Sequence, residues 1–184
     1  MTLDEFLRWE DGTDTRYELI RGVPVAREVQ PVAHGMLVPR LCAAIHSALK
    51  TRRDYAGQVI AAIASPSDGN TCYLADLVVA PTPIRWNEQL ARDPILIIEV
   101  LSASTATFDR ENKVPDYRRI ASVNEILLVD SGCFLVDIYR REGVDWRREI
   151  VADPDVIFTL PSIGIEISMS ELYQGLAFPD DTDL

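Results

Sequence analysis

The chain has 184 residues, of which 47% are hydrophobic and 26% are charged, and its net charge at pH 7 is −11. This length fits one compact domain, and the composition of an ordinary globular protein excludes a disordered or fibrous chain. The acidic balance argues against a nucleic-acid-binding protein, because affinity for a phosphate backbone comes from Lys and Arg. The sequence contains no apolar run near the roughly 20 residues that span a bilayer. Its acidic start also lacks the basic segment of a signal peptide, so we expect a cytoplasmic protein with no membrane partner.

We expect one domain over residues 1–176, followed over residues 177–184 by an acidic tail that contains three Asp residues. The cysteines, Cys42, Cys72 and Cys133, are odd in number and form no C-x-x-C pair. The sequence therefore predicts no zinc or redox site, and we interpret the three as thiols of the core.

The first half of the chain alternates helices and strands. Residues 2–5 have the spacing of a capping box, which predicts a short helix to about residue 9. Apolar runs at 17–20 and 23–25 flank an Arg-Gly pair and predict a hairpin. Apolar residues at helical spacing predict the longest helix over residues 32–51, and the apolar runs 59–64 and 72–80 predict two strands.

The second half of the chain consists mostly of strands. The run 95–101 is apolar and β-branched, which is typical of a strand buried on both faces. We expect a helix between residues 105 and 121, and then strands over 126–130, 134–140 and 144–151. A second capping box predicts a last helix from residue 168 to about residue 174. This order of elements predicts a mixed α/β domain.

Two acidic residues interrupt apolar strands: Asp76 in the run 73–79 and Glu99 in the run 95–101. An ionised carboxylate taken out of water needs a cation, a metal or several hydrogen bonds. Either acid alone would more simply cap a strand end or pair with an Arg. Two in adjacent strands suggest one shared cation, and Mg²⁺ is commonly held by one or two carboxylates with water and substrate phosphates. Together they favour a metal site.

Lys113 follows Glu99 by fourteen residues, with Asp109 four residues before it and Tyr117 four residues after it. The three share a face if their segment is helical, and the simplest interpretation is an ordinary surface Asp–Lys pair. However, the chain contains sixteen Arg and only two Lys. An ammonium is compact and has a pKa that burial can change, which suits the positioning of a nucleophilic water better than a guanidinium does.

Several segments occur in an order that matches a known family: YELIRG at 17–22, His34, ADLVV at 75–79, IEVLSAST at 98–105, and a DR pair at 109–110 before Lys113 and Tyr117. They resemble the Uma-two family of restriction-endonuclease-like proteins, which is part of the PD-(D/E)XK nuclease superfamily. The resemblance extends from about residue 3 to about residue 130. Its most specific part is the block from Glu99 to Tyr117.

The resemblance implies a restriction-endonuclease-like core, with a mixed central sheet flanked by helices. It also implies an endonuclease that hydrolyses phosphodiester bonds in DNA with Mg²⁺ or Mn²⁺ as cofactor. In that case Asp76 and Glu99 would hold the metal, Val100 would add its backbone carbonyl, and Lys113 would complete the catalytic set.

The chain departs from the superfamily pattern at Leu101, where a Lys usually stands. Lys113 can replace that residue only if its helix leans over the end of the strand. Pro115 leaves the geometry of this helix open.

Four further residues are candidates for the same site. Glu18 matches an acidic residue of the family and could reach the metal, although an exposed strand residue is an equally good interpretation. Asp109 and Tyr117 share the predicted face of Lys113. His34 could contact substrate, although a capping or surface role is the simpler interpretation.

Facing carboxylates repel each other in a protein without metal. If Asp76 and Glu99 face each other in this way, Asp76→Asn should cost little stability or should add some. A structural ion pair of Asp76 predicts the reverse.

Two functions stay open from the sequence. The first is the metal-dependent endonuclease, favoured by the intact acidic pair with its lysine. The second is a nuclease-fold protein without catalysis that acts as a binding or assembly module, as a homodimer. The acidic charge of the chain favours the second.

Overall fold

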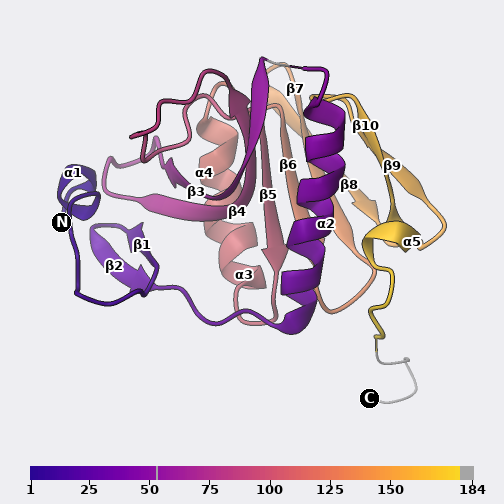
Figure 1. Ribbon diagram of the computed structural model, residues 1–184, viewed down its shortest axis with the longest axis horizontal. Coiled ribbons are helices and arrows are strands. Elements are labelled where there is room, and N and C mark those ends of the chain that lie inside the picture. Colours follow the sequence, from indigo (N-terminus) through magenta and orange to yellow (C-terminus); the bar gives the residue numbers. More distant parts are fainter. Residues whose placement is uncertain (53, 179–184) are drawn as a thin grey trace.

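The chain is built around one eight-stranded sheet, described here by a computed structural model that covers residues 1–52 and 54–178 (Figure 1). The strand order is β2-β1-β4-β5-β6-β7-β8, and β3 pairs with β4. Strands β5 and β6 run parallel, while the other pairs of this sheet run antiparallel. The predicted fold class, a mixed sheet flanked by helices, is confirmed.

The elements follow the order expected from the sequence, with one added hairpin. They are α1 (Leu3–Phe6), β1 (Tyr17–Ile20), β2 (Val23–Ala26), α2 (Val32–Leu49), β3 (Tyr55–Ala64), β4 (Cys72–Pro81), β5 (Leu96–Leu101), α3 (Ala106–Phe108), the π-helical turn η1 (Asp109–Lys113), α4 (Val114–Arg119), β6 (Glu125–Asp130), β7 (Val136–Glu142), β8 (Asp145–Val151), β9 (Ile157–Leu160), β10 (Ile165–Ser168) and α5 (Met169–Leu172).

Two helical layers cover the sheet (Figure 1). Helix α2 lies in front of it and packs Leu37, Leu41 and Ile45 against residues of β5 such as Leu96 and Ile98. This helix is long and apolar enough to cross a membrane by length and composition alone. Its regularly spaced leucines instead cover the sheet, as expected of an amphipathic core helix.

The opposite face of the sheet is covered by α4. Val114 and Tyr117 of this helix pack on Ile97 and Leu101 of β5 and on Leu128 of β6. Strand β5 is therefore buried on both faces, as its apolar run predicts.

The long β3–β4 hairpin bends where it passes Asp76. Ala75 and Leu77 should share a face of β4, yet Ala75 packs on the α4 side of the sheet and Leu77 on the α2 side. Val59 pairs with Leu77 and Ala61 with Ala75, so Ile60 stands opposite Asp76. Ile60 has a φ of 53°, a conformation that β-branched residues rarely adopt. The regular β3–β4 pairing is therefore interrupted at Asp76.

The cysteines divide between the interior and the surface. Cys72 is buried, but Cys133 is exposed in the turn before β7, so its assignment to the core was wrong. The predicted acidic tail falls mostly on residues 179–184, outside the described residues. Phe178 is the last described residue, and it packs against Phe134 and Tyr173.

Candidate metal and catalytic site

The site forms where β4 changes its neighbour. Near Cys72 this strand pairs with β1, and from Leu77 onward it pairs with β5. Between these two stretches, side-chain carboxylates take the place of a strand partner. The amide of Leu74 donates to Glu18 Oε1 over 2.8 Å, that of Val100 to Asp76 Oδ2 over 2.8 Å, and that of Asp76 to Glu99 Oε2 over 3.4 Å.

Buried backbone N–H groups need a partner, and here the carboxylates supply it. The parting of β1, β4 and β5 therefore brings three acidic side chains together inside the sheet.

Asp76 has cationic partners of its own. Its carboxylate is buried, with Arg27 Nη2 2.9 Å from Oδ1 and His34 Nε2 3.1 Å from Oδ2. Burial alone would raise the pKa of Asp76, but the hydrogen bond from His34 and the charge of Arg27 outweigh it, and the pKa lies below its usual value. Asp76 is therefore ionised at neutral pH in the metal-free protein.

Glu99 is more deeply buried than Asp76 and is less easily ionised. Its Oε1 accepts a hydrogen bond from the Tyr117 hydroxyl over 2.6 Å and lies 3.3 Å from Lys113 Nζ. Burial raises the pKa of Glu99 to about 8, and the nearby charges of Asp76 and Asp109 act in the same direction.

Lys113 reaches this cluster from the helix that follows β5. Lys113 is 3% exposed, and its ammonium lies 3.0 Å from Glu18 Oε1 and 3.1 Å from Asp109 Oδ1, in addition to its contact with Glu99. One ammonium thus faces three carboxylates. Burial opposes its charge, but these acids outweigh burial and raise the pKa of Lys113, so it stays protonated.

The local helix geometry explains how Lys113 gets there. The segment Asp109–Lys113 forms a π turn, closed by a hydrogen bond from the Val114 amide to the Asp109 carbonyl. Pro115, directly after, lacks an N–H and cannot make the usual helical bond. The widened turn keeps Asp109, Lys113 and Tyr117 all buried, with Lys113 and Tyr117 in contact with Glu99 of β5.

The structure brings the predicted residues together in two groups. The first group surrounds Lys113 and consists of Glu18, Glu99, Asp109 and Tyr117. The second group consists of Asp76 and His34, and it adjoins the first where β1 and β5 part along β4. The exposed interpretation of Glu18 was wrong, because this residue is buried against Lys113.

The surface interpretation of His34 was wrong as well, because the side chain is buried and contacts Asp76. Sequence reasoning missed Arg27, the direct partner of Asp76. Nothing in the sequence distinguishes it from the other fifteen Arg.

The donor set fits a hard divalent cation only in part. Within residues 1–52 and 54–178, no three His, Cys, Asp or Glu side chains converge as a ready-made metal cage. Two carboxylates and a backbone carbonyl, completed by water, are nevertheless a usual set of ligands for Mg²⁺. Glu99 Oε2 accepts only the long, 3.4 Å hydrogen bond from the Asp76 amide, so among the described residues it is the less satisfied of the two Glu99 oxygens.

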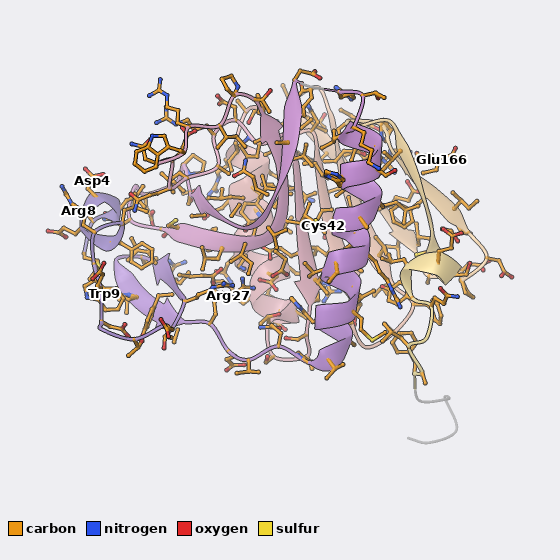
Figure 2. The ribbon with its side chains drawn as sticks, in the orientation of Figure 1. Asp4, Arg8, Trp9, Arg27, Cys42 and Glu166 are labelled. Atoms are coloured by element: carbon orange, nitrogen blue, oxygen red, sulfur yellow. The ribbon has the colours of Figure 1, made fainter. Side chains whose placement is uncertain are left out.

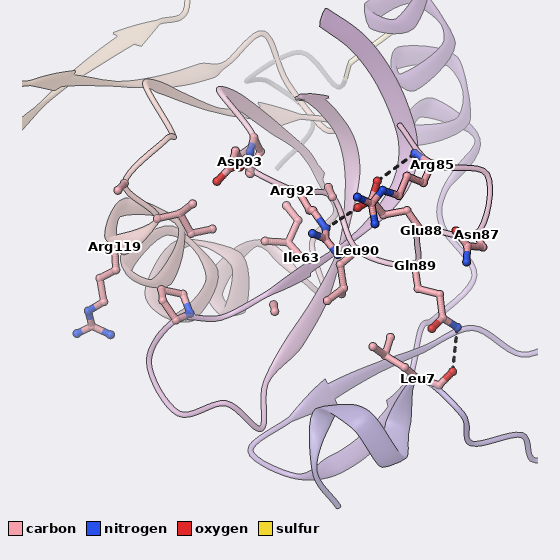
Figure 3. A pocket seen from close by; sticks show the side chains of 16 residues that line it. Leu7, Ile63, Arg85, Asn87, Glu88, Gln89, Leu90, Arg92, Asp93 and Arg119 are labelled. Carbon is pink, nitrogen blue, oxygen red and sulfur yellow. Dashed lines mark hydrogen bonds and ion pairs between the residues drawn. The ribbon is translucent and has the colours of Figure 1, made fainter. Parts of the chain in front are cut away.

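Two clefts of similar size open on the surface. One, of about 650 Å³, reaches Asp76 and is lined also by Arg16, Arg27 and His34. The other, of about 640 Å³, lies between the 85–94 loop and the end of α4 (Figure 3). Its lining includes Arg85, Arg92 and Arg119 but none of the site residues, so we assign the chemistry to the first cleft.

Solved structures support the fold. A crystal structure described as "a putative nuclease belonging to DUF820" from Anabaena variabilis superposes with a TM-score of 0.75 and covers 94% of this chain and 97% of the other, at 22% identity. At that identity the likeness concerns the fold alone.

Two proteins of Synechocystis sp. are similar in sequence. "Uncharacterized protein slr1290" is 28% identical over 177 residues, which are 95% of this chain and 92% of that protein. "Uncharacterized protein sll1609" is 42% identical over 69 residues, which are 36% of this chain and 39% of that protein. A family model described as "Putative restriction endonuclease" matches residues 3–170, and the chain therefore belongs to the Uma2 family.

Proposed function

We propose that this protein is a metal-dependent endonuclease that hydrolyses phosphodiester bonds in DNA. Asp76 and Glu99 would hold Mg²⁺ or Mn²⁺, with the Val100 carbonyl as a further ligand. The observation that carries the proposal is the meeting of two buried carboxylates and a buried ammonium where β4 and β5 part. A bound metal would supply Lewis acidity and neutralise charge on the phosphate. The DNA substrate and a cytoplasmic location are parts of the same proposal.

Lys113 would position the attacking water. Because its pKa is raised, the ammonium stays protonated and can only donate hydrogen bonds, so it would not accept the proton of the water. It would orient the water with an N–H that now faces one of its three carboxylates. Glu18 and Asp109 hold the ammonium in place at 3.0 and 3.1 Å. Tyr117 fixes Glu99 through its 2.6 Å hydrogen bond. These residues keep the reacting groups in one geometry before substrate arrives.

Plasmid cleavage in Mn²⁺ or Mg²⁺ tests the proposal. The chain offers a matched control, since its only other lysine, Lys50, is exposed at the end of α2. Lys113→Ala should lower the cleavage rate by about 100-fold or more, whereas Lys50→Ala should leave it unchanged. Asp76→Asn should also abolish cleavage. Equal rates for Lys113→Ala and wild type would remove Lys113 from the mechanism.

A second function is favoured by a separate observation. Arg27, His34, Lys113 and Tyr117 already satisfy the site carboxylates, as they would in a protein that never binds metal. Such a protein would be a binding or assembly module that acts as a homodimer. Absence of cleavage with every metal and substrate, together with a dimer in sedimentation analysis, would favour this function.

A further inference from the structure

Arg27 contacts Asp76 but has no role in the proposed cleavage reaction. It follows β2 directly and lies between the β1–β2 hairpin and the middle of the sheet (Figure 2). Its Nη2 is 2.9 Å from Asp76 Oδ1, and its side chain is 17% exposed at the cleft that reaches Asp76. Arg27 is thus a protein cation placed on a carboxylate that is proposed to hold a metal.

The contacts of Asp76 divide unevenly between its two oxygens. Oδ2 accepts from the Val100 amide and lies 3.1 Å from His34 Nε2. Oδ1 contacts Arg27, which is its one recorded donor within residues 1–52 and 54–178. A cation that approaches Asp76 therefore meets one protein donor at Oδ1, and that donor is positively charged.

We propose that Arg27 is a positioning residue that occupies Asp76 in the metal-free protein and is exchanged for the metal ion. The inference rests on the proposed function. Arg27 keeps a buried carboxylate ionised and oriented, which otherwise would be costly without a cation. A divalent cation and a guanidinium repel each other and would compete for Asp76 Oδ1, so we expect metal binding to release Arg27.

The released side chain has an anion to bind. It lines the cleft with Arg16 and His34, next to the place where a substrate phosphate would approach the metal. A guanidinium binds phosphate oxygens in a two-pronged geometry, so the same residue would serve Asp76 before metal arrives and a DNA phosphate afterwards. In a chain of net charge −11, such a local cation matters for bringing DNA to the site.

Mn²⁺ binding to the full chain tests the exchange without any need for activity. Free Mn²⁺ is measured by electron paramagnetic resonance for wild type, Arg27→Gln, Arg27→Lys and Arg16→Gln. Arg16 is the matched control, because it lines the same cleft and has no recorded contact with Asp76 in the described part of the chain. Arg27→Gln should bind Mn²⁺ about tenfold more tightly, since one charge-assisted contact no longer competes.

Arg16→Gln changes the charge of the cleft equally and should stay within about twofold of wild type. Arg27→Lys keeps a positive charge and should lie between wild type and Arg27→Gln. Circular dichroism in chelator checks that each variant folds. If Arg27→Gln does not fold, the decision rests on Arg27→Lys, which should still bind Mn²⁺ more tightly than wild type.

Equal Mn²⁺ affinity in wild type, Arg27→Gln and Arg27→Lys would overturn the exchange while leaving the proposed function intact, provided that Asp76→Asn loses Mn²⁺. Equal gains in Arg27→Gln and Arg16→Gln would overturn it too, because they indicate a general charge effect. Absence of binding in wild type and in every variant would instead overturn the proposed function, and the exchange with it.

Discussion

Lys113 is a buried cation shared by three acids. Glu18, Glu99 and Asp109 all lie within 3.3 Å of its ammonium. The first comes from β1, the second from β5 and the third from the same helical segment, so one side chain ties three parts of the fold together. The surface Asp–Lys pair weighed from the sequence does form, but it forms in the interior, where it cannot be exchanged freely for another cation.

Lys113→Arg should therefore fail to restore Mn²⁺-supported cleavage. The guanidinium is planar and larger, so it can pair with the acids but misplaces the water that the ammonium orients. We expect cleavage at least about 100-fold below wild type, close to that of Lys113→Ala. The measurement is plasmid cleavage by the three proteins. Full activity of the Arg variant would mean that charge alone is needed.

Glu99 makes the stability of the metal-free protein depend on pH. Its pKa rises on folding from 4.5 to about 8. A raised pKa adds stability below the unfolded value, and this stability is lost as the pH rises through the folded value. The melting midpoint in chelator should therefore fall between pH 5 and pH 8.

Glu99→Gln should flatten that fall, because the amide cannot ionise. Asp109, whose pKa burial also raises, adds a smaller slope of the same sign that the variant retains. The same slope for Glu99→Gln and for wild type would contradict a raised pKa of Glu99.

Asp76→Asn should destabilise the metal-free protein, which reverses the expectation drawn from the sequence. That expectation assumed repulsion between facing carboxylates, whereas Asp76 is paired with Arg27 and His34 and has a lowered pKa. Loss of the charge leaves Arg27 partly unpaired, at a cost of about 2 kcal/mol. Thermal melts in chelator compare it with Asp145→Asn, an exposed control on β8. Equal melting midpoints for Asp76→Asn and Asp145→Asn would instead indicate that Asp76 and Glu99 repel each other in the metal-free protein.

The sequence predicted a site at Asp76 and Glu99 because each interrupts an apolar strand, and at Lys113 because Lys is rare in this chain. The same pattern does not separate site carboxylates from buried acids that form structural ion pairs. Glu125 and Asp137 also lie in strands and are buried, yet Glu125 pairs with Arg140 and Asp137 with Arg148. These pairs join neighbouring strands, and only the register, which the sequence does not contain, distinguishes them from a site.

The β3–β4 hairpin bends beside Asp76 of the candidate site. Ile60 stands opposite Asp76 with a positive φ, at the point where the buried side chains of β4 change faces. A left-handed conformation costs a β-branched residue roughly 1–2 kcal/mol. Strain of this kind persists where the surrounding structure requires it, often beside functional residues. The strands on either side fix the bend.

Ile60→Gly should therefore be tolerated better than Val59→Gly, although the two positions are adjacent. Glycine removes the strain at position 60, whereas at position 59, where the Val side chain is exposed, it relieves no strain and only adds chain entropy. We expect Ile60→Gly to be more stable than Val59→Gly by about 1 kcal/mol. Urea denaturation of both variants measures the difference. A larger loss for Ile60→Gly would mean that its side chain, and not its backbone, fixes the bend.

Most elements could be predicted from periodicity, and those that could not have a physical reason. The β9–β10 hairpin was missed because its strands have only four residues each, and their exposed residues break the apolar pattern. The π turn at Asp109–Lys113 was not foreseen either. It depends on how the segment before Pro115 packs on β5, a tertiary effect that local spacing does not record.

At the scale of the whole molecule, the net charge of −11 contrasts with a cleft at Asp76 that Arg16 and Arg27 line. The order of helices and strands was sufficient to predict a mixed sheet with helices, because each apolar run must be covered by another layer. The parting of β1, β4 and β5 was not predictable, since it depends on which edge of β4 each neighbour takes. That parting brings the candidate site residues together. The arginines that line its cleft, Arg16 and Arg27, cannot be distinguished from the other Arg in the sequence.

A crystal soaked in Mn²⁺ and measured near the manganese absorption edge tests the metal site most directly. We expect one anomalous peak between the carboxylates of Asp76 and Glu99, with Arg27 withdrawn from Asp76 Oδ1. The same soak of Asp76→Asn should lose the peak. A well-diffracting wild-type crystal with no peak there, or with manganese bound elsewhere, would contradict a metal-dependent nuclease centred on these residues.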